Sequence, residues 1–147
     1  MSRSDYTDDG EAVNLWRGAV ASALRGSRGQ AFLREMLASL DALPEKKLIA
    51  ADLVSPAGEV CALGAVGKSR SLPMETVVPE DYESVARLFG IAEAMQREIV
   101  FLNDEGGPYD ETPDARWRRM RNWVVRNIRE DATAIGTATD GGVMSND

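Results

Sequence analysis

The sequence predicts a single α+β domain that is mostly helical, with about five helices and one small β-hairpin. Apolar residues recur at helical spacing through most of the chain, and two short apolar runs flank a Ser-Pro-Ala-Gly turn. The length of 147 residues corresponds to about one domain. We expect this globular domain to span residues 11–131, between a flexible N-terminus over residues 1–10 and a disordered, Gly-, Thr- and Ser-rich tail over residues 132–147.

Two helices are predicted at the start of the domain. The first covers about residues 11–25 and carries apolar residues at helical spacing: Val13, Trp16, Val20 and Leu24. The second covers about residues 29–43 and carries an apolar stripe: Phe32, Leu33, Met36, Leu37 and Leu40. Gly26 and Ser27 interrupt the helical pattern between them, and Pro44 ends the second helix. Because the connection is short, we expect the two helices to pack antiparallel.

The next segment predicts the β-hairpin. Residues 48–54 and 59–67 are short apolar runs, and the stretch Ser55-Pro-Ala-Gly58 between them has Pro and Gly at favoured turn positions. Ala50-Ala-Asp-Leu53 has little strand propensity, so a helix remains an alternative for residues 45–54.

Two more helices follow an ordered loop over residues 68–78. Pro79 suits the first turn of a helix that runs to about Phe89 and is broken or bent at Gly90. A further helical stretch covers residues 91–103.

The last predicted helix runs from Pro113 to about residue 130, with Thr112 as its cap. Six arginines against two acidic residues give residues 113–130 a net charge of +4, whereas the whole chain has a net charge of −7. This asymmetry predicts a partner-binding face made of five arginines: Arg118, Arg119, Arg121, Arg126 and Arg129. The alternative is a solvated face whose arginines pair with acidic segments of the same chain, such as Asp104-Glu105 and Asp110-Glu111.

Composition argues against several classes of enzyme. The chain has no histidine, which excludes Ser-His and Cys-His dyads and histidine metal sites. Its one cysteine, Cys61, cannot form an intramolecular disulfide and is expected to be a buried apolar side chain in a reducing compartment. We therefore predict no catalytic residue, no cofactor-binding residue and no metal ligand, and we expect no cofactor.

The stretch Ala62-Leu-Gly-Ala-Val-Gly-Lys-Ser69 matches a permissive form of the phosphate-binding loop. Such a loop needs a following helix whose N-terminal amides hold the phosphate, but Pro73 lies four residues after Ser69. We interpret the stretch as a strand whose glycines allow close backbone approach, followed by a solvated Lys-Ser-Arg turn.

Residues 85–99 resemble a helix-turn-helix unit centred on Gly90. However, Gln96 is polar where the second helix should pack against the first, and Glu93 and Glu98 would repel DNA phosphates. Two helices joined at a glycine kink are the alternative interpretation.

Other motifs are weaker. Asp5-x-Thr7-x-Asp9-Gly10 begins like a calcium loop, but its twelfth position is Trp16 instead of Glu. No spacing singles out a pair of carboxylates for acid-base chemistry. No apolar run reaches the ~18–20 residues of a membrane span, and no signal peptide is visible, so we expect a cytoplasmic protein that does not bind membranes.

Five blocks of sequence resemble a family of small uncharacterised proteins encoded by tailed bacteriophages and prophages. These blocks are RGSRGQAFLREML, LPEKKLIAADL, GEVCALGAVGK, LFGIAEAMQREIVFLNDEG and ETPDARWRRMRNWV, within residues 25–128. The resemblance implies a phage accessory protein acting in the bacterial host cytoplasm, and it implies no activity or site residue.

We therefore predict a small non-enzymatic phage or prophage accessory protein that acts by protein–protein interaction. Its partner is expected to be a host or phage protein, for example a component of host defence or transcription. A helix-turn-helix-like DNA-binding regulator is the alternative, and an enzyme using carboxylates and a metal is the second alternative. The sequence indicates no oligomeric state.

Overall fold

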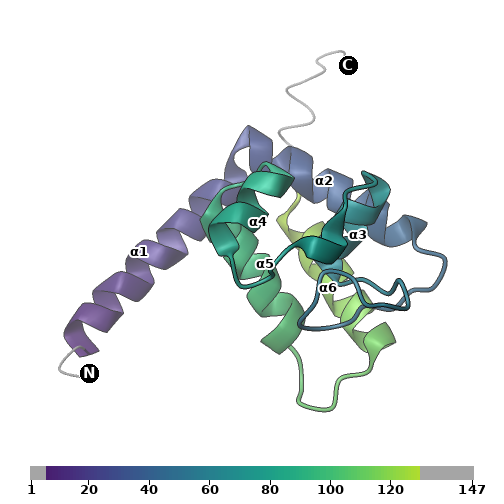
Figure 1. The fold of residues 1–147 in the computed structure, drawn as a ribbon. Helices are drawn as coiled ribbons and strands as arrows, with labels where there is room; N and C mark the ends of the chain where they lie inside the picture. The colour runs from purple at the N-terminus through teal and green to yellow at the C-terminus, as the bar shows by residue number, and fades with distance from the viewer. Residues whose placement is uncertain (1–5, 130–147) are drawn as a thin grey trace, which may run out of the picture.

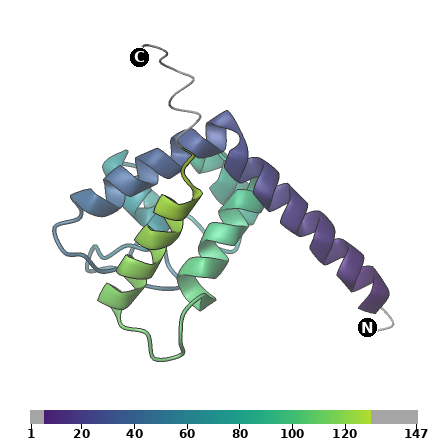
Figure 2. The same cartoon turned by 180° about the vertical axis from the view of Figure 1, so that it is seen from behind.

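The computed structural model describes residues 6–129, with side chains from residue 12 onward, and in this part of the chain the fold is helical without a β-strand (Figures 1 and 2). The elements are α1 (Tyr6–Arg25), α2 (Ser27–Ala42), α3 (Ala62–Ser69), the 3-10 helix η1 (Met74–Thr76), α4 (Tyr82–Phe89), α5 (Glu93–Glu105) and α6 (Pro113–Asn127). The prediction of a mostly helical protein is confirmed. The described residues contain six α-helices, one more than expected, and they do not contain the predicted hairpin.

Helix α1 extends away from the rest of the molecule (Figures 1 and 2). It begins at Tyr6, five residues before the predicted start, and only its second half packs against other helices, through buried residues such as Val20 and Leu24. The far ends of α1 and α2 lie well apart in Figure 1, so the predicted antiparallel packing is wrong. The junction requires glycine, because a Cβ atom on Gly29 would lie 1.9 Å from the carbonyl oxygen of Ala23.

The predicted hairpin is reduced to its turn. The Gly58 N–H donates to the Ser55 carbonyl at 2.8 Å, as the Ser-Pro-Ala-Gly signal predicted, and Val54 forms an isolated antiparallel bridge with Val60. The second apolar run then becomes helix α3 instead of a strand. The Cys61 sulfur caps this helix by accepting a hydrogen bond from the Gly64 N–H.

Helix α3 corresponds to the whole of the phosphate-loop match and is buried over residues 62–67. Its glycines permit close packing: a Cβ on Gly64 would lie 1.9 Å from the Leu53 carbonyl oxygen, and one on Gly67 would lie 2.2 Å from the Met74 sulfur. The expectation of close approach at these glycines is confirmed, whereas the expected strand is wrong.

The later helices follow their sequence signals closely. Helix α4 begins at Tyr82, so Pro79 lies before the helix, although it was expected in the first turn. Asp81 caps α4 by accepting a hydrogen bond from the Ser84 N–H, and Gly90 ends α4 in the left-handed conformation with φ +74°. Thr112 caps α6, as predicted, by accepting a hydrogen bond from the Ala115 N–H. Helix α6 ends at Asn127, three residues before the predicted end.

One hydrophobic core joins all six helices. Helix α2 packs against α1, α3 and α6, while α5 packs against α1, α3, α4 and α6. The largest fully buried apolar side chains come from helices α2 to α6 and from the loop between α2 and α3. They are Leu33, Met36, Leu40, Leu48, Leu63, Phe89, Met95, Ile99 and Met120. None of the described helices is both long and apolar enough to cross a membrane.

Candidate functional site

The predicted arginine face of α6 does not form one free surface, because two of its members are held by carboxylates. Arg119 makes two hydrogen bonds to Glu111, at 2.6 and 2.7 Å. Arg121 makes two hydrogen bonds to Asp41 of α2, at 2.7 and 3.1 Å. Both arginines therefore pair with carboxylates of the same chain, as the alternative interpretation of the arginine face describes.

The other three predicted residues are more exposed. Arg118 pairs with Asp114 one helical turn earlier, at 3.4 Å. Arg126 forms no ion pair within the part of the chain that the structure describes. Arg129 lies beyond the end of α6, where its backbone N–H donates to the side chain of Gln30 at 2.7 Å. The five arginines therefore differ in their contacts.

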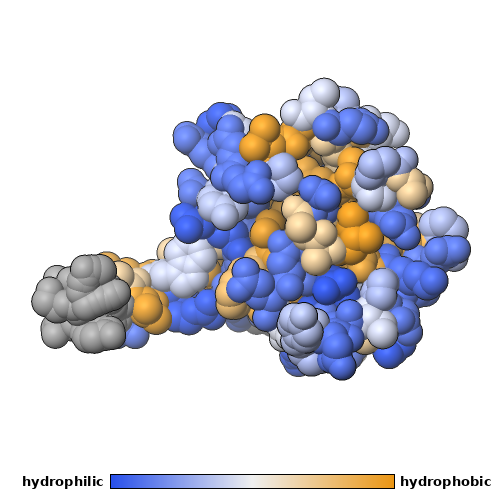
Figure 3. Space-filling view, turned by 60° about the horizontal axis from the view of Figure 1, so that its bottom comes forward, coloured by the Kyte–Doolittle hydropathy of each residue, from blue (hydrophilic) through white to orange (hydrophobic). Residues whose placement is uncertain are grey.

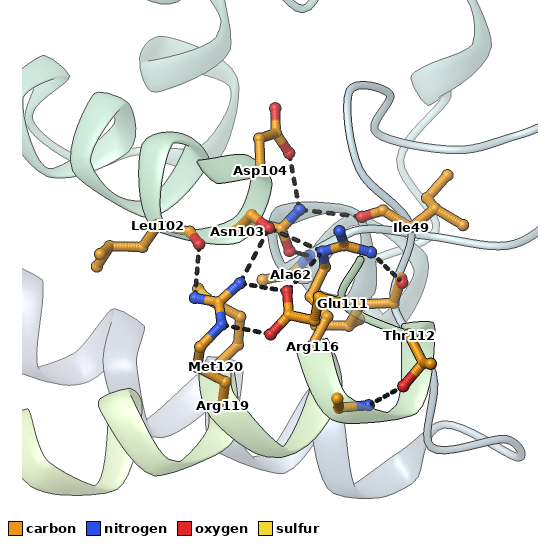
Figure 4. A network of polar contacts seen from close by, with 12 residues as sticks. Ile49, Ala62, Leu102, Asn103, Asp104, Glu111, Thr112, Arg116, Arg119 and Met120 are labelled. Atoms are coloured by element: carbon orange, nitrogen blue, oxygen red, sulfur yellow. Dashed lines mark hydrogen bonds and ion pairs between the residues drawn. The ribbon is translucent and has the colours of Figure 1, made fainter. Parts of the chain in front are cut away.

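A buried polar network surrounds the first turns of α6 (Figure 4). The side chain of Glu111 is 4% exposed and is contacted by both Arg119, at 2.6 Å, and Arg116, at 3.5 Å. Arg116 also donates to the carbonyl of Asn103, and Arg119 donates to the carbonyl of Leu102. Because the last turn of a helix leaves carbonyl groups without intrahelical donors, these arginines satisfy the end of α5.

Asn103 extends the same network to the irregular segment that precedes α3. Its side-chain oxygen accepts from the Ala62 N–H at 3.1 Å, and its side-chain nitrogen donates to the Ile49 carbonyl at 2.9 Å. The neighbouring Asp104 accepts from the N–H of Ala51, which adopts a positive φ of 79°. These side chains form the hydrogen bonds that the backbone of this segment does not form within a sheet. We therefore interpret the network as structural.

Charge pairing lowers the pKa of the carboxylates in these contacts. Hydrogen bonds from Arg119 and the nearby positive charges lower the pKa of Glu111, against the opposing effect of burial. The Arg121 guanidinium lowers the pKa of Asp41 in the same way. Neither carboxylate is thus suited to hold a proton near neutral pH, which general-acid catalysis requires.

Cys61 does not have the properties of a nucleophile. Burial raises the pKa of its thiol to about 12, so the reactive thiolate is not populated at neutral pH. The expectation of a buried cysteine is confirmed. Among the described residues, no group of three His, Cys, Asp or Glu side chains is placed to hold a metal ion.

The Gly-Lys-Ser end of the phosphate-loop match lies at the wrong end of its helix. Lys68 and Ser69 form the last turn of α3, where backbone carbonyl groups face outward and the helix dipole is negative. A phosphate group is bound by the amides and positive dipole of a helix N-terminus. This geometry supports the interpretation that the stretch does not bind nucleotides.

The helix-turn-helix resemblance corresponds to α4, Gly90 and α5, but α5 is not presented as a recognition helix. Four other helices pack around it, and Gln96 and Glu98 are buried. The exposed residues Glu93, Arg97 and Glu105 give its free face a net negative charge. Such a face repels DNA phosphates.

An open groove lies where α1 diverges from α5, and sequence reasoning did not identify it. Its volume is about 370 Å³. We call this surface the α1–α5 groove, and the residues that line it are Trp16, Arg17, Tyr82, Arg97, Glu98, Val100, Phe101, Asp104 and Glu105. The helical spacing of Val13 and Trp16 indicated an apolar face on α1, but the sequence did not show that this face extends beyond the core.

Aromatic and charged side chains form the walls of the α1–α5 groove. The guanidinium of Arg97 lies 5.3 Å from the ring centre of Trp16 and 4.8 Å from that of Tyr82, so it bridges the two rings. Arg17 donates to the buried carboxylate of Glu98 at 2.9 Å, which joins α1 to α5. These contacts order the base of the groove.

No protein-family model, curated protein or solved structure matches this chain.

Proposed function

We propose that this chain is a non-enzymatic protein that binds an amphipathic helix of a partner protein in the α1–α5 groove. One observation carries the proposal: apolar side chains are uncovered at the groove and on the arm of α1 beside it. Phe101 of α5, which lines the groove, is 52% exposed, and Val13, one helical turn before the groove residue Trp16 on α1, is 55% exposed. Figure 3 shows the arm formed by α1 as a separate projection with hydrophobic side chains on it. Exposed apolar residues that gather at a groove are typical of a protein-binding surface.

The charge of the groove favours a basic partner helix. Arg17 and Arg97 are already paired, with Glu98 and Glu93 respectively. By contrast, Glu105 at the other end of the groove has no ion pair within the described residues. The groove therefore presents unpaired negative charge beside its apolar surface, and the chain as a whole has a net charge of −7. A helix with Lys or Arg beside an apolar stripe is complementary to this arrangement.

The chemistry of the described residues supports binding over catalysis. The only cysteine is buried and protonated, the chain has no histidine, and the carboxylates of lowered pKa are paired with arginines. The resemblance to phage-encoded proteins suggests a bacterial or phage protein as the source of the helix. This context is part of the proposal.

The proposal is tested by affinity capture from bacterial lysate with three baits: the wild type, Phe101→Asp and Tyr109→Asp. Tyr109 is a matched control, because it is also an exposed aromatic residue but lies in the loop between α5 and α6. We expect a defined protein to bind the wild type and Tyr109→Asp and to be lost with Phe101→Asp. Circular dichroism should show that all three baits are folded.

The identified partner should then bind in a salt-dependent manner, and Glu105→Lys should weaken it. Retention of every partner by the folded Phe101→Asp variant would contradict the proposal. A fourth bait that carries Arg118→Glu and Arg126→Glu tests the arginine face of α6. Loss of partners with this bait alone would assign binding to the exposed arginines of α6.

A further inference from the structure

Gln96 is a fully buried side chain in α5 whose polar atoms have no partner within the described protein. Both its Oε1 and its Nε2 lack a hydrogen bond to a protein group. An amide that is buried without hydrogen-bond partners destabilises the folded state, because it has lost its bonds to water. The other buried amides do not share this situation: Gln30 and Asn103 use both their nitrogen and oxygen in bonds to protein groups.

A small cavity lies beside Gln96, between α5, the start of α3 and the segment around Leu53. Its volume is about 20 Å³, and its apolar lining includes Leu63 of α3, Val85 of α4 and Ile99 of α5. A cavity of this size holds about one water molecule and is too small for an organic ligand. Besides Gln96, the polar or charged residues that line it are Asp52, Cys61, Asn103 and Asp104.

We infer that this cavity is a binding site for a single internal water molecule held by Gln96. A group that both donates and accepts hydrogen bonds is required, because Oε1 needs a donor and Nε2 needs an acceptor. Water meets both needs, and Asn103 or Cys61 offers the third polar contact that buried waters commonly make. Helix α5 would then contact the start of α3 through this water as well as through Asn103.

The site is tested first by a high-resolution crystal structure of the wild-type protein. We expect one ordered water within hydrogen-bonding distance, roughly 2.7–3.2 Å, of both amide atoms of Gln96. A dry cavity, or an amide that is turned to bond a protein group directly, would overturn the inference.

A second test uses Gln96→Met, which keeps the length of the side chain and removes both polar atoms. We expect water relaxation dispersion to count one fewer long-lived internal water in this variant than in the wild type. Gln30→Met is the matched control, since Gln30 bonds only protein groups in the described structure and its loss should leave the water count unchanged. The thermal midpoint should fall further for Gln30→Met than for Gln96→Met. An unchanged water count in Gln96→Met, or an equal fall of both midpoints, would count against the site.

Discussion

The carboxylate of Glu111 and the guanidinium of Arg119 are joined by two parallel hydrogen bonds of 2.6 and 2.7 Å. Glu111 lies in the loop between α5 and α6, and Arg119 lies in α6. Arg119 also donates to the Leu102 carbonyl of α5 at 2.7 Å. One side chain therefore fixes the end of α5, the α5–α6 loop and the helix α6 relative to one another. The positive charge of Arg119 is therefore paired within the protein, with the carboxylate of Glu111.

We predict that Glu111→Gln lowers the free energy of unfolding by about 3 kcal/mol, because it leaves Arg119 and Arg116 without their buried counter-charge. Urea denaturation of the variant and the wild type measures this change. Arg118→Gln is the control, since the Arg118–Asp114 pair is exposed and should contribute only about 0.5 kcal/mol. An equal loss of unfolding free energy in the two variants would show that the buried pair contributes no more stability than the exposed pair.

Stability should also depend on acid pH. The pKa values of Glu111, Glu35 and Asp41 are lowered in the folded state by hydrogen bonds from arginines. A lowered pKa contributes stability above the unfolded-state pKa, roughly 4, and this contribution is lost as pH falls through the folded pKa. Thermal midpoints measured from pH 7 to pH 2 should be level above about pH 5 and should then fall.

The pH dependence has an internal check. The fall below pH 5 should be shallower in Glu111→Gln than in the wild type, because one of the carboxylates with a lowered pKa no longer titrates. An identical fall of the thermal midpoint with pH in the two proteins would show that Glu111 does not contribute to the pH dependence.

Gly64→Ala should destabilise the protein by about 3 kcal/mol, since its Cβ would overlap the Leu53 carbonyl oxygen at 1.9 Å and the backbone has to shift. Gly18→Ala is a matched substitution in a helix, and nothing lies within 4 Å of the added Cβ. It should increase helix stability by about 1 kcal/mol. Urea denaturation and helicity by circular dichroism distinguish the two effects, and a neutral Gly64→Ala would contradict the close packing of α3.

Cys61 should be unreactive in the folded protein. Its thiol is buried, with a pKa of about 12, so a disulfide reagent at pH 8 finds neither access nor thiolate. We expect labelling to be very slow in buffer and to accelerate across the urea unfolding transition. Rapid, complete labelling without urea would show that α3 opens readily.

The sequence predicted those parts of the fold that depend on local chemistry. The caps at Thr112 and Gly90 and the turn at Ser55–Gly58 were recognised because a few neighbouring residues determine them. Helix α3 was assigned as a strand because a short run that is buried on every side has no helical periodicity. The partner that stabilises its first turn, Asn103, lies 41 residues later, so no local pattern could indicate it.

The candidate sites were predicted less well than the fold. The charge asymmetry of α6 is visible in the sequence, where it is compatible both with a free arginine face and with internal pairing. Which arginines are paired depends on where Asp41 and Glu111 come to lie, and that is a tertiary property. The α1–α5 groove depends on the angle at which α1 leaves α5, which the apolar spacing of the two helices does not determine.

In the proposed binding mode, the projecting half of α1 couples recognition of the partner to a helix–coil equilibrium. A helix that is not buried is only marginally stable in water, so the arm has an ordering cost that a bound partner would have to overcome. Gly18 is an exposed residue in the second half of α1 and increases the cost of forming the whole helix, because glycine disfavours the helix by about 1 kcal/mol relative to alanine. We therefore expect Gly18→Ala to raise the affinity for the proposed partner several-fold, because it stabilises α1 and leaves the residues that line the α1–α5 groove unchanged.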